Sequence, residues 1–195
     1  MTPKEALAAL CLSPETFLKT YPLMIAGKSQ SGPADYVIYQ EMPADKKFKI
    51  GAFGNNGEPF KAYNVPMLQS TQFQGLGTSG PHRVQIPGVS LGNDRDLMVT
   101  GQLTGCSFLV QNTGGSVLCA HIQPQGGLDG SKLHTSLINN AQFQGQASAS
   151  QLIVFGRNFY PSGRATVVGV RRLGRWEIYA QLGDAHSVTG VHRIL

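Results

Sequence analysis

The sequence has little charge, little cysteine and no long hydrophobic run. Charged residues make up 14% of the 195 residues and 41% are hydrophobic, which excludes an intrinsically disordered chain. No stretch approaches the roughly twenty apolar residues that a membrane-spanning helix needs, so we expect no membrane span. Internal repeats and low-complexity segments are also absent. A single domain over residues 1–195 is expected, because a chain of this length can bury a core of its own.

Cysteine is too scarce for a disulfide-stabilised scaffold. The chain has Cys11, Cys106 and Cys119, and because their number is odd at least one thiol stays unpaired within it. This favours folding in a reducing compartment. Cys106, Cys119, His121 and His134 are tolerable zinc ligands by type, but their spacing matches no standard zinc motif. We therefore expect neither a metal nor a cofactor.

Acidic residues are in the minority, and the formal net charge is +5. This moderate charge permits an acidic partner without requiring one. A basic hairpin is expected to turn at Leu173 and Gly174, with Trp176 beside the turn. Because no nucleic-acid motif accompanies it, a protein surface is the expected partner and nucleic acid is not. The late basic residues are Arg157, Arg164, Arg171, Arg172 and Arg175.

Glycine and proline, by contrast, are frequent, with 24 and 11 residues spread along the chain. Many turns of this kind favour a sheet protein over a helix bundle. Two short helices are expected within about residues 2–20, because Thr2-Pro3 and Ser13-Pro14 are helix-start signals. A further helix is expected over 130–142.

Strand patterns dominate after residue 33. The segment 54–59 is expected to be a turn, so that 60–65 returns alongside 48–53, and residues 66–95 are assigned to a long loop. The expected fold class is α+β, a mainly antiparallel β-sheet or sandwich with a few peripheral helices and long loops. The expected strands are 34–40, 48–53, 60–65, 97–103, 106–111, 116–122, 151–156, 165–172 and 175–182.

One predicted hairpin carries both a cysteine and a histidine. If Gly114 and Gly115 form its two-residue turn, Cys106 lies opposite position 123. Side chains alternate between the two faces of a strand, so Cys106 and His121 become diagonal neighbours on one face, with backbones about 7–8 Å apart. A four-residue loop gives the same register. A three-residue loop would place the two side chains on opposite faces unless a bulge intervened.

A Cys-His pair of this kind is able to perform nucleophilic catalysis. Cysteine attacks as the thiolate, and a neighbouring imidazole lowers its unperturbed pKa of about 8.5. A third group usually accepts the other N–H of the imidazole, and Thr100 is a candidate for that role. The Thr104-Gly105 turn would let the backbone N–H of Cys106 or a neighbour face a substrate carbonyl oxygen, as an oxyanion hole requires.

These residues also carry a family resemblance. The pattern Thr-x5-Cys, with a small residue and Gly directly before the Cys and a His at the end of the next strand, resembles glutamine deamidases of the cytotoxic necrotizing factor and Burkholderia lethal factor type, and the chemotaxis-receptor deamidase. It covers about residues 97–123. The resemblance implies that Cys106 is the nucleophile, His121 the base and Thr100 the orienting group. Within the family the third member varies, and Thr104 stands where the toxins typically have Ser.

The resemblance implies a reaction and a setting. The thiolate would attack the carboxamide of a protein glutamine, ammonia would leave, and hydrolysis of the thioester would give glutamate; an amine in place of water would give transglutamination. The implied protein is a bacterial effector or toxin, made in the bacterial cytoplasm and then secreted or translocated into the cytosol of a target cell. From the short N-terminal segment we expect a self-standing effector. The family suggests a small GTPase or a translation factor as target. Loops 66–95, 123–132 and 157–164 are expected to surround the pair.

Two other functions stay open. One is a thiol peptidase or amidase with the same pair. The other is a non-catalytic β-rich binding module that uses the basic C-terminal hairpin, since free cysteine is among the most buried residue types. Cys119 is a rival nucleophile that we expect in the core. Surface or loop positions are expected for His82, His134, His186 and His192.

Overall fold

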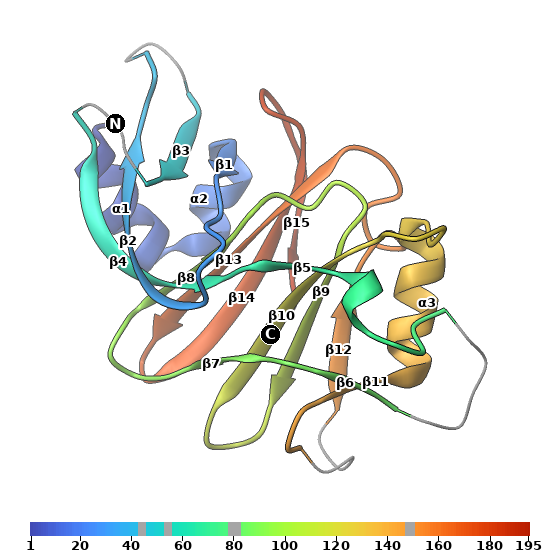
Figure 1. The fold of residues 1–195 in the computed structure, drawn as a ribbon. Helices are drawn as coiled ribbons and strands as arrows, with labels where there is room; N and C mark the ends of the chain where they lie inside the picture. Colours follow the sequence, from blue (N-terminus) through green and yellow to red (C-terminus); the bar gives the residue numbers. More distant parts are fainter. Residues whose placement is uncertain (43–45, 53–55, 78–82, 147–150) are drawn as a thin grey trace.

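The computed structural model describes the chain apart from residues 43–45, 53–55, 78–82 and 147–150 (Figure 1). It is built mainly of strands, with two helices at the N-terminus and one between strands late in the chain, so the expected α+β class is confirmed. In the described part of the chain, no helix combines the length and the apolar character that crossing a membrane would require. His82 lies outside the described residues.

The larger sheet has eight strands in the order β1-β3-β2-β4-β8-β13-β14-β15. The β1/β3 and β4/β8 pairs are parallel, and the other neighbours in this sheet are antiparallel. Its strands are β1 (Leu23–Ile25), β2 (Gly32–Tyr39), β3 (Phe48–Gly51), β4 (Glu58–Val65), β8 (Leu97–Thr100), β13 (Arg164–Arg172), β14 (Arg175–Gly183) and β15 (Val188–Arg193).

A second sheet has the order β12-β9-β10-β5, and β7 pairs with the part of β10 that β5 leaves open. A separate two-stranded pair is formed by β6 and β11. These strands are β5 (Met67–Gln69), β6 (Val84–Ile86), β7 (Val89–Leu91), β9 (Ser107–Asn112), β10 (Val117–Gln123), β11 (Ala141–Phe143) and β12 (Leu152–Phe155). A single-turn helix, η1 (Ser70–Gln72), follows β5.

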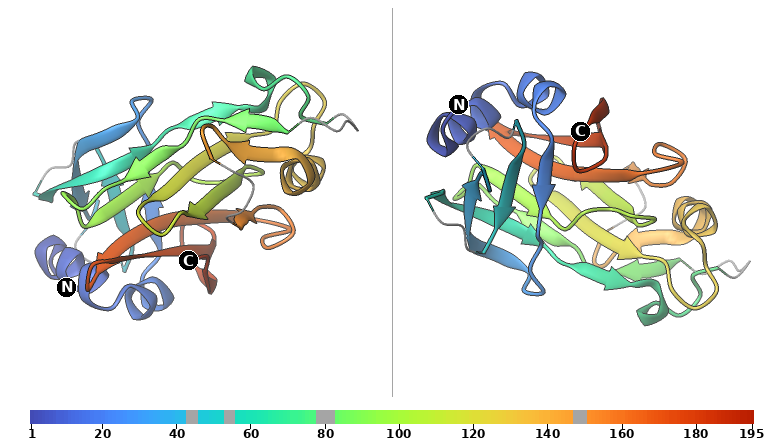
Figure 2. Two further views of the ribbon diagram at one scale, coloured as in Figure 1. Left: turned by 90° about the horizontal axis from the view of Figure 1, so that it is seen from below. Right: turned by 90° about the horizontal axis from the view of Figure 1, so that it is seen from above.

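The helices cover the outer faces of the two sheets (Figure 2). α1 (Pro3–Leu12) and α2 (Pro14–Thr20) pack on the eight-stranded sheet, and α3 (Gly130–Asn140) packs on the second sheet. Both N-terminal helices begin where the sequence predicts, and Thr2 and Glu5 form a capping box at the first. α3 begins after Asp129, whose carboxylate accepts the N–H of Lys132 at 2.8 Å.

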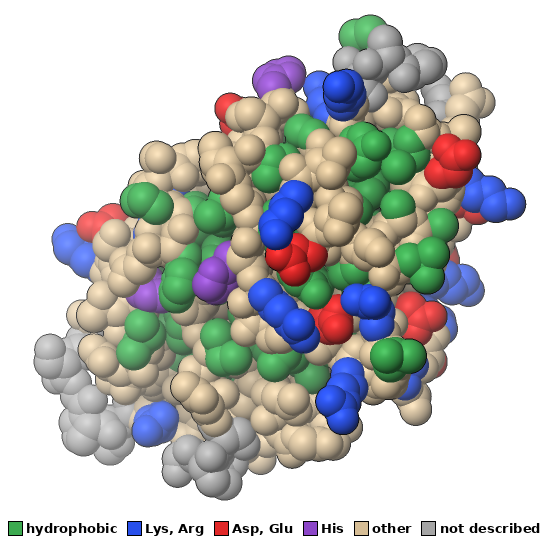
Figure 3. Space-filling model, turned by 180° about the vertical axis from the view of Figure 1, so that it is seen from behind, with side chains coloured by type: hydrophobic (Ala, Val, Ile, Leu, Met, Phe, Trp, Pro, Cys, Tyr) green, Lys and Arg blue, Asp and Glu red, His purple; other side chains and the backbone are tan. Residues whose placement is uncertain are grey.

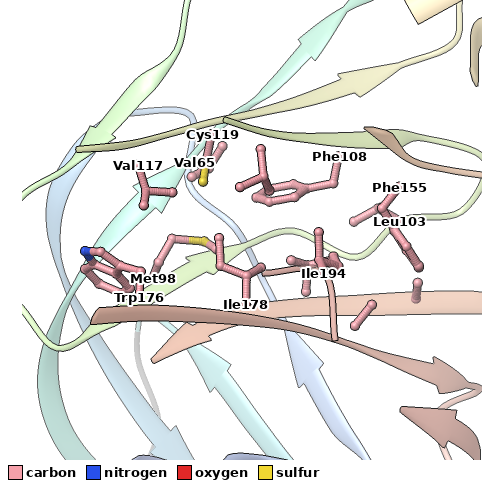
Figure 4. Packing of buried hydrophobic residues seen from close by; sticks show 14 of the residues in the cluster. Val65, Met98, Leu103, Phe108, Val117, Cys119, Phe155, Trp176, Ile178 and Ile194 are labelled. Atoms are coloured by element: carbon pink, nitrogen blue, oxygen red, sulfur yellow. The ribbon is translucent and has the colours of Figure 1, made fainter. Parts of the chain in front are cut away.

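The main core lies between the two sheets, as Figure 4 shows. The inward side chains of β9 and β10, among them Phe108 and Cys119, meet Met98 and Ile178 of the larger sheet. Residues that alternate with them, such as Leu109, face α3 instead. Each large apolar side chain removed from water here contributes about 1.5–3 kcal/mol. This core fixes which face of β9 and β10 looks toward the larger sheet.

Two predicted hairpins are confirmed. In β9–β10, Val117 pairs with Asn112 and Ile122 with Ser107, and the N–H of Thr113 donates to the Ser116 carbonyl at 2.9 Å across the Gly114-Gly115 turn. In β13–β14, Leu173 and Gly174 form the turn with φ of 49° and 78°, the positive values that a two-residue hairpin of this twist requires.

The expected pairing of 60–65 with 48–53 is wrong. β4 pairs instead with β2, where Ala34 lies opposite Ala62, and β3 occupies the other edge of β2. A turn signal predicts that the chain reverses but not which strand it then joins. Here both free edges of β2 are used, so β2 separates the two segments that the sequence suggested would be neighbours.

The assignment of residues 66–95 to one loop is also wrong for its described part. That segment contains β5, η1, β6 and β7. Strands of three residues are too short to show alternation, and they form because neighbouring strands offer open edges. The same reason explains why β1 and β11 were not predicted. The expected strand 97–103 ends at Thr100, and Leu103 makes an isolated bridge to Ala165.

Candidate active site

Two strands from different sheets bring Thr100 and His121 into contact. Thr100 ends β8 in the larger sheet, and His121 lies in β10 of the second. The Thr100 hydroxyl oxygen is 2.8 Å from Nδ1 of His121, and the same hydroxyl donates to the carbonyl of Val65 at 2.7 Å. All three residues are buried. The contact therefore connects the sheets through polar groups at the edge of an otherwise apolar core.

The hydroxyl contact determines the tautomer of His121. A threonine hydroxyl has one proton, and Thr100 gives it to Val65. Thr100 can then only accept from His121, which places the imidazole proton on Nδ1 and leaves a lone pair on Nε2. Among the described residues, Nε2 is buried without a hydrogen-bond partner. The imidazole is thus oriented with an unused base at its far end.

Cys106 lies on the same face as this imidazole. His121 pairs directly with Phe108, so Cys106, two residues earlier, takes the diagonal position. The burial pattern supports this, because Cys106 and Phe108 belong to the core between the sheets whereas Ser107 and Leu109 point the other way. The β9–β10 register agrees with the expected diagonal arrangement, although Cys106 itself precedes β9 and its thiol makes no hydrogen bond with Nε2 of His121.

Tyr160 holds the turn that carries the thiol. Its hydroxyl accepts the N–H of Gly105 at 3.3 Å and donates to the carbonyl of Cys106. Gly105 has a φ of +123°, which favours glycine at this point of the Thr104-Gly105 turn. The Gly105 amide is therefore already bonded. The backbone amides of Thr104 and Cys106 face the sulfur.

Burial nevertheless dominates the electrostatics of the pair. Cys106 is 2% exposed, and removal from water raises the pKa of its thiol more than the backbone amides and Arg157 lower it. Burial also lowers the pKa of His121 to about 4. Both side chains are neutral near pH 7 in this arrangement, because neither charge would be solvated. The pair rests as thiol and imidazole, not as the thiolate and imidazolium of an open site.

Two connecting segments cover the Cys106 turn. Arg157 donates to the Tyr160 carbonyl at 3.0 Å and lies over the Tyr160 ring. A Cβ on Gly130, at the start of α3, would lie 2.5 Å from both Arg157 Cγ and the Gly105 carbonyl oxygen, so only glycine fits there. Both segments fall within the loops 123–132 and 157–164 that we expected at the site. Because Cys106 is 2% exposed, a glutamine side chain can reach the sulfur only if some of its surroundings move.

The third expected loop, 66–95, contributes through its first strand. Met67 of β5 pairs directly with His121. Val65, whose carbonyl accepts from Thr100, precedes it by two residues, with Pro66 between them. This short stretch crosses from the larger sheet to the second, so that one end accepts a hydrogen bond from Thr100 and the other pairs with His121.

Sequence reasoning missed Val65, Arg157 and Tyr160. A backbone carbonyl has no side-chain signature, so Val65 was not predictable. Tyr160 follows Phe159 in a loop with no motif of its own. The one available signal is that aromatic residues are unusual in a Gly- and Pro-rich loop unless they pack against something, and Tyr160 does so by stacking on Phe155 with ring centroids 5.6 Å apart.

Cys119 and His134 are also buried. Cys119 is buried opposite Val110 and burial strongly raises its pKa. His134 is not at the surface as expected but is buried on α3, where its ring meets Phe159 edge-on. Within the described ranges, no three side chains of metal-binding type gather into a cluster.

Comparisons with known proteins give little. No family model and no curated protein sequence matches the chain. Among solved structures, the C-terminal domain of CNFy from Yersinia pseudotuberculosis is similar over 99% of both chains, with a TM-score of 0.39 and 11% identity. A similarity of this strength is too weak to support a conclusion about chemistry. The function is therefore argued from the geometry of this chain.

Proposed function

We propose that the protein is a cysteine-dependent protein-glutamine deamidase, with Cys106 as nucleophile and His121 as general base. The observation that carries the proposal is the bond from Nδ1 of His121 to Thr100, whose own proton is committed to Val65. It leaves Nε2 as the unprotonated nitrogen on the face that Cys106 shares. A purely structural histidine in an apolar core would be expected to satisfy both nitrogens.

The proposed reaction begins with proton transfer. Nε2 of His121 takes the thiol proton as Sγ of Cys106 attacks the side-chain carboxamide carbon of a glutamine. The carbonyl oxygen becomes an oxyanion, and the backbone amides of Thr104 and Cys106 are the proposed donors to it, because the Gly105 amide is bonded to Tyr160. The imidazolium then gives its proton to the leaving nitrogen, which departs as ammonia. Thr100 accepts from Nδ1–H throughout and stabilises the transient positive charge.

The second half of the reaction consumes water. His121 removes a proton from water as its oxygen attacks the thioester carbonyl, and the C–S bond breaks. Cys106 recovers its proton and the target carries glutamate. Starting from a neutral pair suits this sequence, because the charges form only when a substrate carbonyl is present to receive the electron pair. No thiolate is therefore present before the substrate binds.

The proposal includes the setting. An enzyme that acts on a glutamine of a folded protein can recognise its target through surface loops and needs no deep pocket. The segments around Gly130 and Arg157, beside the Cys106 turn, are loops of this kind. We propose that the protein is a toxin-like effector that is made in a bacterium and delivered to the cytosol of another cell. Its target would be a protein with a surface glutamine, for which small GTPases and translation factors are the first to test.

The test is a comparison of variants on candidate targets. Purified protein is incubated with each target, and intact mass together with released ammonia is measured. Wild type should release ammonia and leave the chain uncut, whereas Cys106→Ser and His121→Ala should not. Cleavage of the target would instead identify a thiol peptidase with the same pair. Equal activity in all three proteins would refute the assignment of the pair.

The burial of Cys106 favours a second candidate, a non-catalytic β-rich binding module. However, acidic neighbours offset much of the positive charge of the β13–β14 hairpin. Arg172, and Arg193 of the adjacent β15, both contact Glu177, and Arg171 contacts Asp96. On the face in Figure 3, Lys and Arg side chains are interspersed with acidic ones. A binding module would retain affinity for its partner in Cys106→Ser and would release no ammonia from it.

A further inference from the structure

Tyr160, which holds the Cys106 turn, also lines a surface groove of about 290 Å³. The groove lies between the segment 159–163 and the neighbouring ends of β14 and β15. One residue therefore both bonds the backbone of the candidate nucleophile through its hydroxyl and belongs to the lining of an open site. A ligand in the groove would sit beside the cover of Cys106.

A β-bulge shapes this groove. The β14–β15 register shifts between Leu182 and Gly183, and Gly183 has a φ of +143°. Across from it, Gly163 approaches so closely that a Cβ there would lie 3.1 Å from the Gly183 carbonyl oxygen. Bulges are frequent next to functional sites, where they redirect the chain. The hollow is built into the backbone at this point.

The walls combine apolar surface with one negative charge. Phe159 is 43% exposed, which is high for a large aromatic side chain, and Leu182 of β14 is also part of the lining. Asp184 is the one charged residue of the lining. Its Oδ1 accepts the backbone N–H groups of His186 and Ser187 at 2.7 and 2.8 Å. These bonds hold the pKa of Asp184 below its usual range, so the rim carries a fixed carboxylate near neutral pH.

One nearby basic side chain, that of Arg157, is committed elsewhere. Arg157 donates to the carbonyls of Tyr160 and Gly163 and lies over the Tyr160 ring. It clamps the segment from the side of Cys106. Arg164, opposite Gly183 on β13, donates to Gln102 at 3.4 Å, and His186 lies near Asp184 outside the lining, so Asp184 is the charged group that faces the groove. An anionic ligand would be repelled there, and a wholly apolar ligand would leave the carboxylate unused.

We propose that the groove binds a lysine or arginine side chain of the protein substrate, located a few residues from the target glutamine. The aliphatic stem lies along Phe159 and Leu182, and the cation reaches Asp184, an arrangement that suits long basic side chains. Phe159 adds a cation–π contact. This inference rests on the proposed function for its link to glutamine. The binding of a cation in the groove does not.

Binding is tested without any substrate. Backbone amide NMR shifts are followed while n-butylguanidinium is added, with uncharged n-butylurea as the control ligand. Saturable shifts of Gly163, Gly183 and Asp184 with the cation alone are expected, and Asp184→Asn should abolish them. Asparagine keeps an Oδ1 that can accept the two backbone N–H groups, so the loop should stay folded. Asp96→Asn, an exposed carboxylate elsewhere, should change nothing. Equal shifts with n-butylurea, or no shifts, would overturn the site.

Specificity is tested with peptide pairs. Glutamine peptides carrying arginine one to three residues from the glutamine are compared with the same peptides carrying citrulline, and ammonia release is measured. Wild type should prefer arginine by roughly twofold to fivefold, the range of an exposed ion pair, and Asp184→Asn should lose the preference while still releasing ammonia. Equal rates of ammonia release from both peptides would refute the proposed role of the groove and leave the deamidase proposal intact. If neither peptide releases ammonia but n-butylguanidinium still binds, the deamidase proposal is refuted and the cation site in the groove is retained.

Discussion

Replacing Thr100 by valine removes one oxygen that serves two buried groups. The change is nearly isosteric, so it leaves the Val65 carbonyl and Nδ1–H of His121 without the bonds of 2.7 and 2.8 Å that they now make. A buried polar group without a partner costs about 1–3 kcal/mol, and we expect a loss of stability of that order. Thr100→Ser keeps the oxygen and should retain most of the stability.

The catalytic consequence is separable from this loss. A hydrogen bond to a group that becomes charged contributes about 1.5–3 kcal/mol, and each 1.36 kcal/mol is a factor of ten in rate. We therefore expect a roughly 10- to 100-fold loss of kcat in Thr100→Val for a protein that is still folded at assay temperature. Without the acceptor, the tautomer of His121 should also become mixed.

Imidazole nitrogen-15 shifts provide a readout that does not depend on activity. At pH 7 the wild type should show a neutral His121 with its proton on Nδ1, and Thr100→Ser should show the same. The reasoning is refuted if the wild type carries the proton on Nε2, or if Thr100→Val keeps both the Nδ1–H tautomer and full activity. Either result would mean that Thr100 does not orient the ring.

Four further outcomes are expected. Cys106→Ser should lose activity to background, whereas Cys119→Ser should keep it and cost about 1–3 kcal/mol of stability by burying a hydroxyl in the core, measured by ammonia release and urea unfolding. Tyr160→Phe should lower kcat without raising KM, because the turn loses the hydroxyl that joins Gly105 to Cys106; an unchanged kcat would contradict this. In the free protein, iodoacetamide should label half-buried Cys11 fastest and Cys119 slowest, which peptide mapping would show. The folded pKa of His121, about 4, lies below the unfolded value of about 6.5. The free energy of unfolding should therefore be highest above pH 6.5 and fall by roughly 3 kcal/mol as the pH drops toward 4, because protonation then favours the unfolded state. Urea unfolding of His121→Gln should show a flatter pH profile.

The parts of the site that were predictable are those with local sequence signals. Gly114 and Gly115 mark a two-residue turn, and from that turn strand alternation places Cys106 and His121 on one face. Thr100 was found because it lies at a fixed spacing from the cysteine on the preceding strand. Each of these inferences needed only neighbouring residues and the period of a β-strand.

The parts that were not predictable depend on distant segments. Tyr160 reaches Gly105 from a loop fifty-five positions away in the chain, and nothing near either residue indicates the other. β4 was paired with the wrong strand because its turn fixes a reversal, not a partner. The neutral state of the thiol and imidazole depends on burial by both sheets, which no short pattern encodes. Long-range packing decided these features.

The crossing at Val65, Pro66 and Met67 makes backbone length a determinant of how Thr100 and His121 meet. Val65 supports Thr100 from within the larger sheet, and Met67, two residues on, is the ladder partner of His121 in the second. Side chains at these positions can vary, since both contacts are made by the main chain. Adding or removing one residue here would shift one contact while the other stayed in register. Homologues should therefore differ in composition across this crossing and agree in its length.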